Sequence, residues 1–314
     1  MKRFKKILLL SREGSGERAT LARAVELAKR NRARLTLVEV VEQLPRQLGM
    51  LVTTMPPVDL EKLVVEERKE RLEALVAPLV EDEVRASAVV LCGTPFLEII
   101  REVLRKKHDL VILTAEGRGG VKDRLFGSTS LHLMRKCPCP VWVMKPTRSR
   151  RYNRILAAVD PHPSDPERTA LNVKILDLAT SLAHLEKSLV HVVHVWRLPG
   201  ETMYHSGRAG IPERTLEEML AEARDQSQRN LDELMAGYTL EDLKHRIHLL
   251  KGEPRVLIPE FVQRERINLI VMGTVCRTGI PGFLIGNTAE SVLQQVDTSV
   301  LTVKPDGFVT PVTG

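Results

Sequence analysis

Hydrophobic residues recur along the chain in short runs separated by amphipathic stretches. The runs 7–10, 35–41 and 110–113 are almost entirely apolar, which is typical of short strands buried on both faces of a sheet. The stretches between them carry apolar residues at helical spacing, as in the helix predicted over 17–31. This alternation predicts right-handed crossovers and a parallel sheet.

The same reading predicts two sets of five strands, each alternating with four helices. In the first half the strands are 7–10, 35–41, 87–91, 110–113 and 141–144, and the helices are 17–31, 59–80 and two beginning near 96 and 128. In the second half the strands are 155–159, 189–195, 247–250, 269–272 and 300–303, and the helices are 167–184, 214–236, 255–264 and 287–295. The predicted class is α/β, with two Rossmann-like, doubly wound units that have helices on both faces. Ligands of such sheets bind beyond the carboxyl ends of the strands.

The chain also repeats itself at a fixed offset. Gly93-Thr94-Pro95 returns as Gly252-Glu253-Pro254, and Lys145-Pro146 returns as Lys304-Pro305, each 159 positions later. A period this long indicates duplication of a whole domain. We expect a first domain over 1–147, a second over 152–306 and a tail over 307–314, with a basic, polar linker between the domains.

Composition and charge exclude several classes of protein. The 314 residues carry a net charge of +7, but the eleven aromatic residues do not alternate with basic ones as in a nucleic-acid stacking surface. No apolar stretch approaches the length of a membrane span, and the N-terminal apolar run ends at Leu10, too early for a signal peptide. We therefore expect a cytoplasmic protein with no membrane span and no nucleic-acid partner.

Few residues suggest catalysis or metal binding. The four cysteines include Cys137 and Cys139, whose spacing lacks the pattern of a zinc site, so reduced thiols are expected. His191 and His194 lie three apart on a predicted strand and so on opposite faces, which argues against a shared metal. No nucleophile–base–acid set is found, and we predict neither catalytic nor metal-binding residues.

Glycine-rich segments follow the fourth strand of each half and precede a helix. The second-half segment contains Gly273 and Gly286, with Asn287 and Thr288 at the helix start, and the first-half segment contains Gly117, Gly127 and Ser128. Backbone N–H groups in such a loop, together with a helix N-terminus, suit a phosphate group. Glycines after a strand are equally common as simple turns, so both interpretations stay open.

Taken together, these segments resemble the universal stress protein family, in which Gly, two residues, Gly, nine residues and Gly-Ser or Gly-Thr form a nucleotide signature. The resemblance includes Asp160 at the end of a first strand, covers nearly the whole chain twice, and is greatest to the tandem, E-type members of bacteria. It implies an adenine nucleotide alpha hydrolase-like fold, pairing of domains and a role in stress survival.

The resemblance implies a ligand site mainly in the second domain. Asp160 would accept a hydrogen bond from ribose or base, the glycine loop would contact phosphate, and Arg277 would supply charge. The implied site residues are Val159, Asp160, Val195, Gly273, Arg277, Gly286, Asn287 and Thr288, with Gly117, Gly127 and Ser128 in the first domain. A structural alternative is that Asp160 caps the next helix and the glycines only turn the chain.

Both halves depart from the signature. In the first, Arg12 stands where the family has Asp, and Thr114 replaces the first glycine. In the second, Cys276 replaces the middle glycine and Asn287 replaces Ser or Thr. A cation in place of the acceptor carboxylate indicates that the first domain is not an ordinary ATP site.

The leading functional hypothesis is a regulatory, ligand-binding stress-response protein rather than an enzyme. The resemblance implies ATP or AMP as ligand, with Mg²⁺ only as the companion of a nucleotide. One alternative is a lipid-like or other small molecule held under the long connections 42–58 and 197–213; another is a weak ATP-hydrolysing enzyme. The expected partners are a small-molecule ligand, the second domain through intramolecular pairing, and a second copy of the chain in a homodimer.

Overall fold

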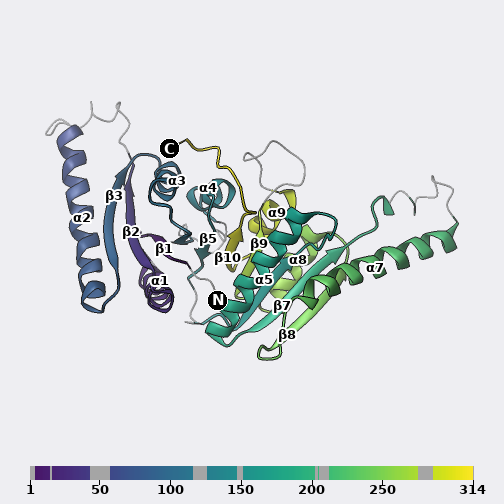
Figure 1. Cartoon of the computed structure of the whole chain (residues 1–314). Coiled ribbons are helices and arrows are strands. Elements are labelled where there is room, and N and C mark those ends of the chain that lie inside the picture. The colour runs from purple at the N-terminus through teal and green to yellow at the C-terminus, as the bar shows by residue number, and fades with distance from the viewer. Residues whose placement is uncertain are drawn as a thin grey trace. The chain divides into compact units, whose positions relative to one another are not determined.

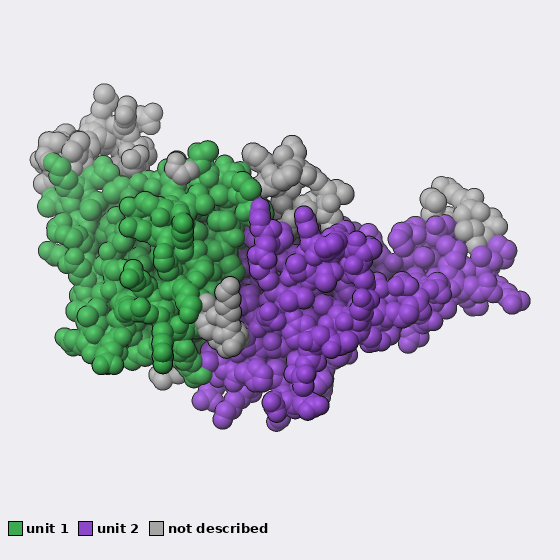
Figure 2. All heavy atoms as spheres, in the orientation of Figure 1, with its two compact units in different colours: residues 1–150, 279–284, 308–314 green, residues 151–278, 285–307 purple. Residues whose placement is uncertain are grey.

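In the computed structural model, the structure describes residues 4–14, 16–42, 57–115, 126–146, 151–201, 204, 212–274 and 286–313. These residues form two compact units (Figures 1 and 2). Of the described residues, unit 1 contains 4–146 and the tail 308–313, and unit 2 contains 151–274 and 286–307. Arg101 Nε donates to the carbonyl oxygen of Thr313 at 3.4 Å, which ties the tail to a helix of unit 1.

Unit 1 is a parallel five-stranded sheet in the order β3-β2-β1-β4-β5. Its strands are β1 (Lys6–Leu10), β2 (Arg34–Val41), β3 (Ala86–Cys92), β4 (Leu110–Thr114) and β5 (Val141–Met144). Its helices are α1 (Glu17–Asn31), α2 (Pro57–Glu81), α3 (Pro95–Lys106) and α4 (Ser128–Lys136). Figure 1 shows these helices beside the sheet; α3 packs on α4, while α1 contacts β1, β2 and β4.

Unit 2 repeats this arrangement in the order β8-β7-β6-β9-β10, again with every pairing parallel. Its strands are β6 (Arg154–Val159), β7 (Leu189–Trp196), β8 (His245–Lys251), β9 (Leu269–Gly273) and β10 (Ser299–Val303). Its helices are α5 (Pro166–Glu186), α7 (Glu213–Ala236), α8 (Pro254–Arg264) and α9 (Asn287–Gln295). The predicted α/β class, with two five-stranded parallel units, is confirmed.

The core of each unit is its central strands. The side chains of Ile7, Leu8, Val111 and Ile112 are fully buried in unit 1, as are those of Ile155, Leu156, Ile270 and Val271 in unit 2. Strands buried on both faces explain why these segments read as continuous apolar runs rather than alternating ones.

The repeated Gly-x-Pro turns have one conformational reason in both units. Gly93 ends β3 with φ +140°, and Gly252 ends β8 with φ +142°. L-residues with a side chain rarely adopt this backbone region. Each glycine N–H donates to the preceding parallel strand, to Val41 in unit 1 and to Trp196 in unit 2, both at 2.9 Å. The following proline then begins α3 or α8 with its φ already set for a helix.

The order of strands reverses between β1 and β4 in unit 1 and between β6 and β9 in unit 2. In a doubly wound sheet this switch point lies at the strands' carboxyl ends, where ligands bind. A ligand is therefore expected to lie beside the residues that follow β1, β6 and β9.

Candidate functional site

In unit 2, Asp160 directly follows β6 and is held by its main chain. Its N–H donates to Asn172 Oδ1 at 2.9 Å, and Asn172 Nδ2 donates back to its carbonyl oxygen at 2.9 Å. Asn172 lies on α5 and is only 3% exposed. This double clamp fixes the peptide at the switch point and leaves the Asp160 side chain 42% exposed. The predicted acceptor carboxylate therefore faces outward on a rigid base.

A second carboxylate, Asp165, caps the next helix. Asp165 accepts from the N–H of Arg168 at 3.1 Å, the ordinary N-cap contact. The alternative that Asp160 caps α5 is therefore wrong. Arg168 Nε also lies 2.9 Å from Asp165 Oδ2, and its Nη1 lies 4.0 Å from Asp160 Oδ2. The sequence reading missed Arg168, a half-buried cation beside the predicted acceptor.

The neighbouring strand β7 contributes a buried imidazole. His194 is 6% exposed, and its Nδ1 lies 3.3 Å from the carbonyl oxygen of Val159. Since a carbonyl only accepts, Nδ1 carries the proton in this contact and Nε2 is left as an acceptor when the ring is neutral. Val159 is buried and Val195 is half-buried on their strands, so both predicted residues flank the switch point as packing groups.

The predicted glycines of unit 2 have different roles. A Cβ on Gly273 would lie 2.8 Å from Leu171 Cδ2, so this glycine allows α5 to pack against the end of β9. Gly286 is the N-cap of α9 with φ −61°, and its N–H donates to the carbonyl oxygen of Thr274 at 3.3 Å. Asn287 is the first residue of the helix and not its N-cap.

The N-cap of α9, Gly286, has no side chain with which to cap the helix. The first N–H groups of a helix have no partner within the helix, and such groups suit the predicted phosphate position. Asn287 is exposed and Thr288 is half-buried at this end. The predicted Arg277, together with Cys276, lies outside the described residues.

A buried lysine stands at the same edge of unit 2. Lys304 directly follows β10, is 4% exposed, and donates from Nζ to Thr274 Oγ1 at 2.5 Å. Thr274 is fully buried and also accepts from Gly286, so it links the lysine to the start of α9. A buried ammonium group is costly unless it is hydrogen-bonded. In the sequence, Lys304 was noted only as part of the repeat. Its position directly after a buried strand could have identified it as a candidate site residue.

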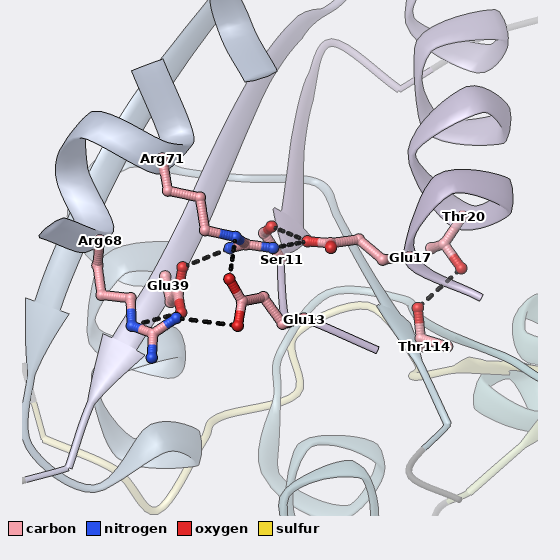
Figure 3. Close-up of polar contacts among 8 residues, drawn as sticks. All are labelled: Ser11, Glu13, Glu17, Thr20, Glu39, Arg68, Arg71 and Thr114. Carbon is pink, nitrogen blue, oxygen red and sulfur yellow. Dashed lines mark hydrogen bonds and ion pairs between the residues drawn. The ribbon is translucent and has the colours of Figure 1, made fainter. Parts of the chain in front are cut away.

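In unit 1 the strand ends are filled by charged side chains (Figure 3). Arg71 on α2 reaches Glu39 Oε2 at 2.7 Å and Glu13 Oε1 at 3.0 Å, and it also binds Glu17. Arg68 lies 3.5 Å from Glu39. We call the five residues Glu13, Glu17, Glu39, Arg68 and Arg71 the unit 1 ion network.

The network surrounds the end of β1. Ser11 Oγ donates to Glu17 Oε1 at 2.6 Å, so the first residue after β1 is joined to the first residue of α1. Glu39 is only 9% exposed, and burial raises the pKa of its carboxyl even though Arg71 and Arg68 act in the opposite direction. Arg12, the departure from the family pattern, is exposed just after Ser11.

At two of the matching positions unit 2 has no carboxylate. Leu8 of β1 and Leu156 of β6 occupy matching positions in the two units. Leu8 pairs with Thr36, and Leu156 pairs with His191. Glu39, three residues after Thr36, therefore corresponds to His194, three residues after His191. The helix position of Glu17 corresponds to Asn172 when counted back from the left-handed residues that end α1 and α5. The two units therefore share a fold but differ at the switch point: ion pairs close it in unit 1, whereas unit 2 keeps an outward carboxylate.

The predicted residues of unit 1 do not form a comparable arrangement. Gly127 is the half-buried N-cap of α4 and Ser128 is exposed at its first position, while Gly117 lies outside the described residues. Thr114, which replaces the first signature glycine, donates to Thr20 Oγ1 at 2.8 Å and so joins β4 to α1 (Figure 3).

The described part of the chain shows neither a metal-binding cluster nor a membrane-spanning helix. Within these ranges no group of three or more His, Cys, Asp or Glu side chains is placed to hold a metal ion. Nor does any described helix have the length and apolar character needed to cross a membrane.

Comparison with known proteins agrees with the duplicated fold. The model of the universal stress protein family matches residues 3–145 and again 151–304. Universal stress protein E of Salmonella typhi is 32% identical over 71% of this chain and 70% of its own length. Universal stress protein E of Photorhabdus laumondii is 24% identical over 99% of this chain and 98% of its own length.

Solved structures show the same architecture. A functionally unknown protein from Pseudomonas aeruginosa PAO1 superposes with a TM-score of 0.71 at 26% identity, covering 98% of this chain and 95% of that one. A putative universal stress protein from Pseudomonas aeruginosa UCBPP-PA14 gives a TM-score of 0.72 at 25% identity over the same shares. With two family matches, conserved topology in both units and E-type relatives along most of its length, the chain belongs to the universal stress protein family as a tandem of two such domains.

Proposed function

We propose that this tandem universal stress protein is a cytoplasmic, ligand-binding regulator in which unit 2 takes an adenine nucleotide, ATP or AMP. The observation that carries the proposal is the carboxylate of Asp160, held outward at the switch point by the Asn172 clamp. A fixed, exposed acceptor at this position suits the hydroxyl groups of a ribose. Adenine itself rests on the family resemblance.

The phosphate side of the proposed site rests on three groups. The start of α9 offers the N–H groups of its first turn, after an N-cap glycine that has no side chain. Arg168 is a half-buried cation 4.0 Å from Asp160, and the Lys304 ammonium group is linked to α9 through Thr274. Positive groups around a helix N-terminus favour an anion. Mg²⁺ would enter only with ATP, held by its phosphates.

Unit 1 has a structural role in this proposal. Its ion network fills the strand ends, and Glu39 and Glu17 would repel an anionic ligand there. The network places three carboxylates around Arg71 and Arg68, so its net charge is negative and disfavours a phosphate. One nucleotide per chain is therefore expected.

Calorimetric titration of the full chain with ATP and with AMP tests the proposal. We expect one site per chain, and Asp160→Ala should weaken binding about tenfold or more, because a charge-assisted hydrogen bond contributes about 1.5–3 kcal/mol. The matched control is Arg12→Ala, at the corresponding place in unit 1, which should leave the affinity unchanged. Nucleotide affinity that is unchanged in Asp160→Ala would contradict the assignment of the site. An equal loss of affinity in Arg12→Ala would indicate that unit 1 also contributes to binding.

An apolar ligand is the second candidate because of one surface feature. Leu198, Met219 and Ala223 line an apolar groove between the end of β7 and α7, with Glu218 and Glu222 beside them. Mass spectrometry of molecules released from the purified protein distinguishes the candidates. An adenine nucleotide would support the proposal, and a lipid would support an apolar ligand bound in the groove.

A further inference from the structure

Two thiols meet in unit 1 where α4 joins β5. The Sγ atoms of Cys137 and Cys139 lie 3.6 Å apart. Cys137 is fully buried at the C-cap of α4, whereas Cys139 is half-buried. Each cysteine is followed by a proline, whose ring fixes φ, so few backbone torsions are free to move the thiols apart.

Both ends of this turn are anchored to regular structure. The N–H of Cys137 donates to Leu133 at 2.9 Å, continuing α4, and the carbonyl oxygen of Pro140 accepts from Val111 of β4 at 3.0 Å. The thiols therefore face each other in a fixed frame. A disulfide has an S–S distance of about 2.05 Å, so closure requires the sulfur atoms to approach by about 1.5 Å.

We propose that Cys137 and Cys139 form a reversible disulfide by exchange with a low-molecular-weight disulfide such as glutathione disulfide. The Cys139 thiolate attacks one sulfur of the reagent, whose S–S bond breaks and releases one glutathione thiolate. The Cys137 thiolate then attacks the Cys139 sulfur and releases the second glutathione. Two protein thiols are oxidised, one reagent disulfide is reduced to two thiols, and the protons from the cysteines pass to the released thiolates.

Exposure assigns the order of the two steps. Cys139 is the more exposed residue of the pair and is therefore assigned the first attack, while Cys137, which is buried, acts as the resolving thiol. The contact with Cys137, together with burial, raises the pKa of the Cys139 thiol well above its ordinary value. Its thiolate is scarce at neutral pH, so exchange is slow there and faster as pH rises. The pair responds to a sustained change in thiol–disulfide balance rather than to a brief pulse.

The test equilibrates the folded full chain with glutathione buffers of increasing disulfide content, then traps the remaining thiols with maleimide after acid quenching. We expect the peptide that carries both cysteines to lose two modifiable thiols together, with a mass decrease of about 2 Da and no retained glutathione. Cys92, which is exposed in β3, provides an internal control because it has no facing thiol in the described structure and should take up a glutathione adduct.

Two variants separate the steps. Cys137→Ser should retain a stable glutathione adduct on Cys139, and Cys139→Ser should leave Cys137 unmodified because it is buried. Wild-type protein that keeps both thiols in the most oxidising buffer, or that accumulates the same adduct on Cys139 as Cys137→Ser, would overturn the proposal. The outcome does not depend on nucleotide binding, since the pair lies in unit 1 and the proposed ligand site in unit 2.

Discussion

Protonation of His191 should destabilise unit 2 in mild acid. His191 lies on β7, is fully buried, and its Nδ1 is 3.1 Å from Nε2 of His248 on β8. The edge of Phe261 from α8 meets both rings. In this contact one imidazole donates and the other accepts, which the neutral pair can do, whereas a doubly charged pair would place like charges in contact.

The size of the effect follows from the pKa of His191, which burial and the neighbouring His248 lower from 6.5 to about 4. Glu265 acts in the opposite direction, and Arg246 and Arg154 add to the lowering. Between pH 6.5 and about 4 the unfolded chain binds more protons at this residue than the folded chain. Stability is therefore fully present above pH 6.5 and is lost as pH falls toward 4, by about 3 kcal/mol, since one pKa unit is worth about 1.4 kcal/mol.

The assay is urea unfolding at pH 7.5 and at 4.5, followed by tryptophan fluorescence. The chain has two tryptophans, Trp142 in unit 1 and Trp196 at the end of β7, so Trp142→Phe leaves a reporter of unit 2 alone. In this background, His191→Leu should remove about 2.5 kcal/mol of the stability that is lost between pH 7.5 and 4.5, which is less than the full effect because the range ends above the folded pKa.

The control is His184→Gln, which replaces an exposed histidine on α5. It should leave unchanged the free energy of unfolding that unit 2 loses between pH 7.5 and 4.5. The reasoning fails if His191→Leu loses as much stability between the two pH values as the parent, because the acid response would then originate elsewhere in unit 2.

Two further substitutions test features of the fold. Arg71→Met should lower the free energy of unfolding of unit 1 by about 2 kcal/mol, because it leaves half-buried carboxylates without their counter-charge. The control Lys69→Met, on the exposed face of α2, should lower it by less than about 0.5 kcal/mol. Gly252→Ala should lower the free energy of unfolding by about 1–2 kcal/mol because the backbone of Gly252 has φ +142°. Gly237→Ala at the end of α7, where φ is −76°, should leave stability almost unchanged. Thermal unfolding measures both variants, and an equal loss of stability in the two would refute the backbone argument.

The predicted elements agree closely with the structure because their signals are local. The helix predicted over 17–31 is α1, Glu17–Asn31, and the strand predicted over 155–159 is β6, Arg154–Val159. Apolar periodicity identifies such elements when the strands are buried on both faces. The right-handed crossover rule then gives a parallel sheet, as found in both units.

The candidate site was predicted less completely. The sequence pointed to Asp160 and Gly286, but gave no sign that Asn172 would hold the first or that Leu171 would explain Gly273. These contacts depend on the packing of α5 against β6 and β9, which no local pattern encodes.

By itself, the sequence determined that the chain contains one five-stranded unit twice, because the hydrophobic period, the turn glycines and the constant offset can all be read from the order of residues along the chain. Only the tertiary structure decided which charged groups meet. Glu39 and Arg71 are 32 positions apart and His191 and His248 are 57 apart, and each pair is joined because parallel strands and their covering helices bring distant side chains to the same place. The difference between a closed switch point in unit 1 and an outward carboxylate in unit 2 is a result of that packing.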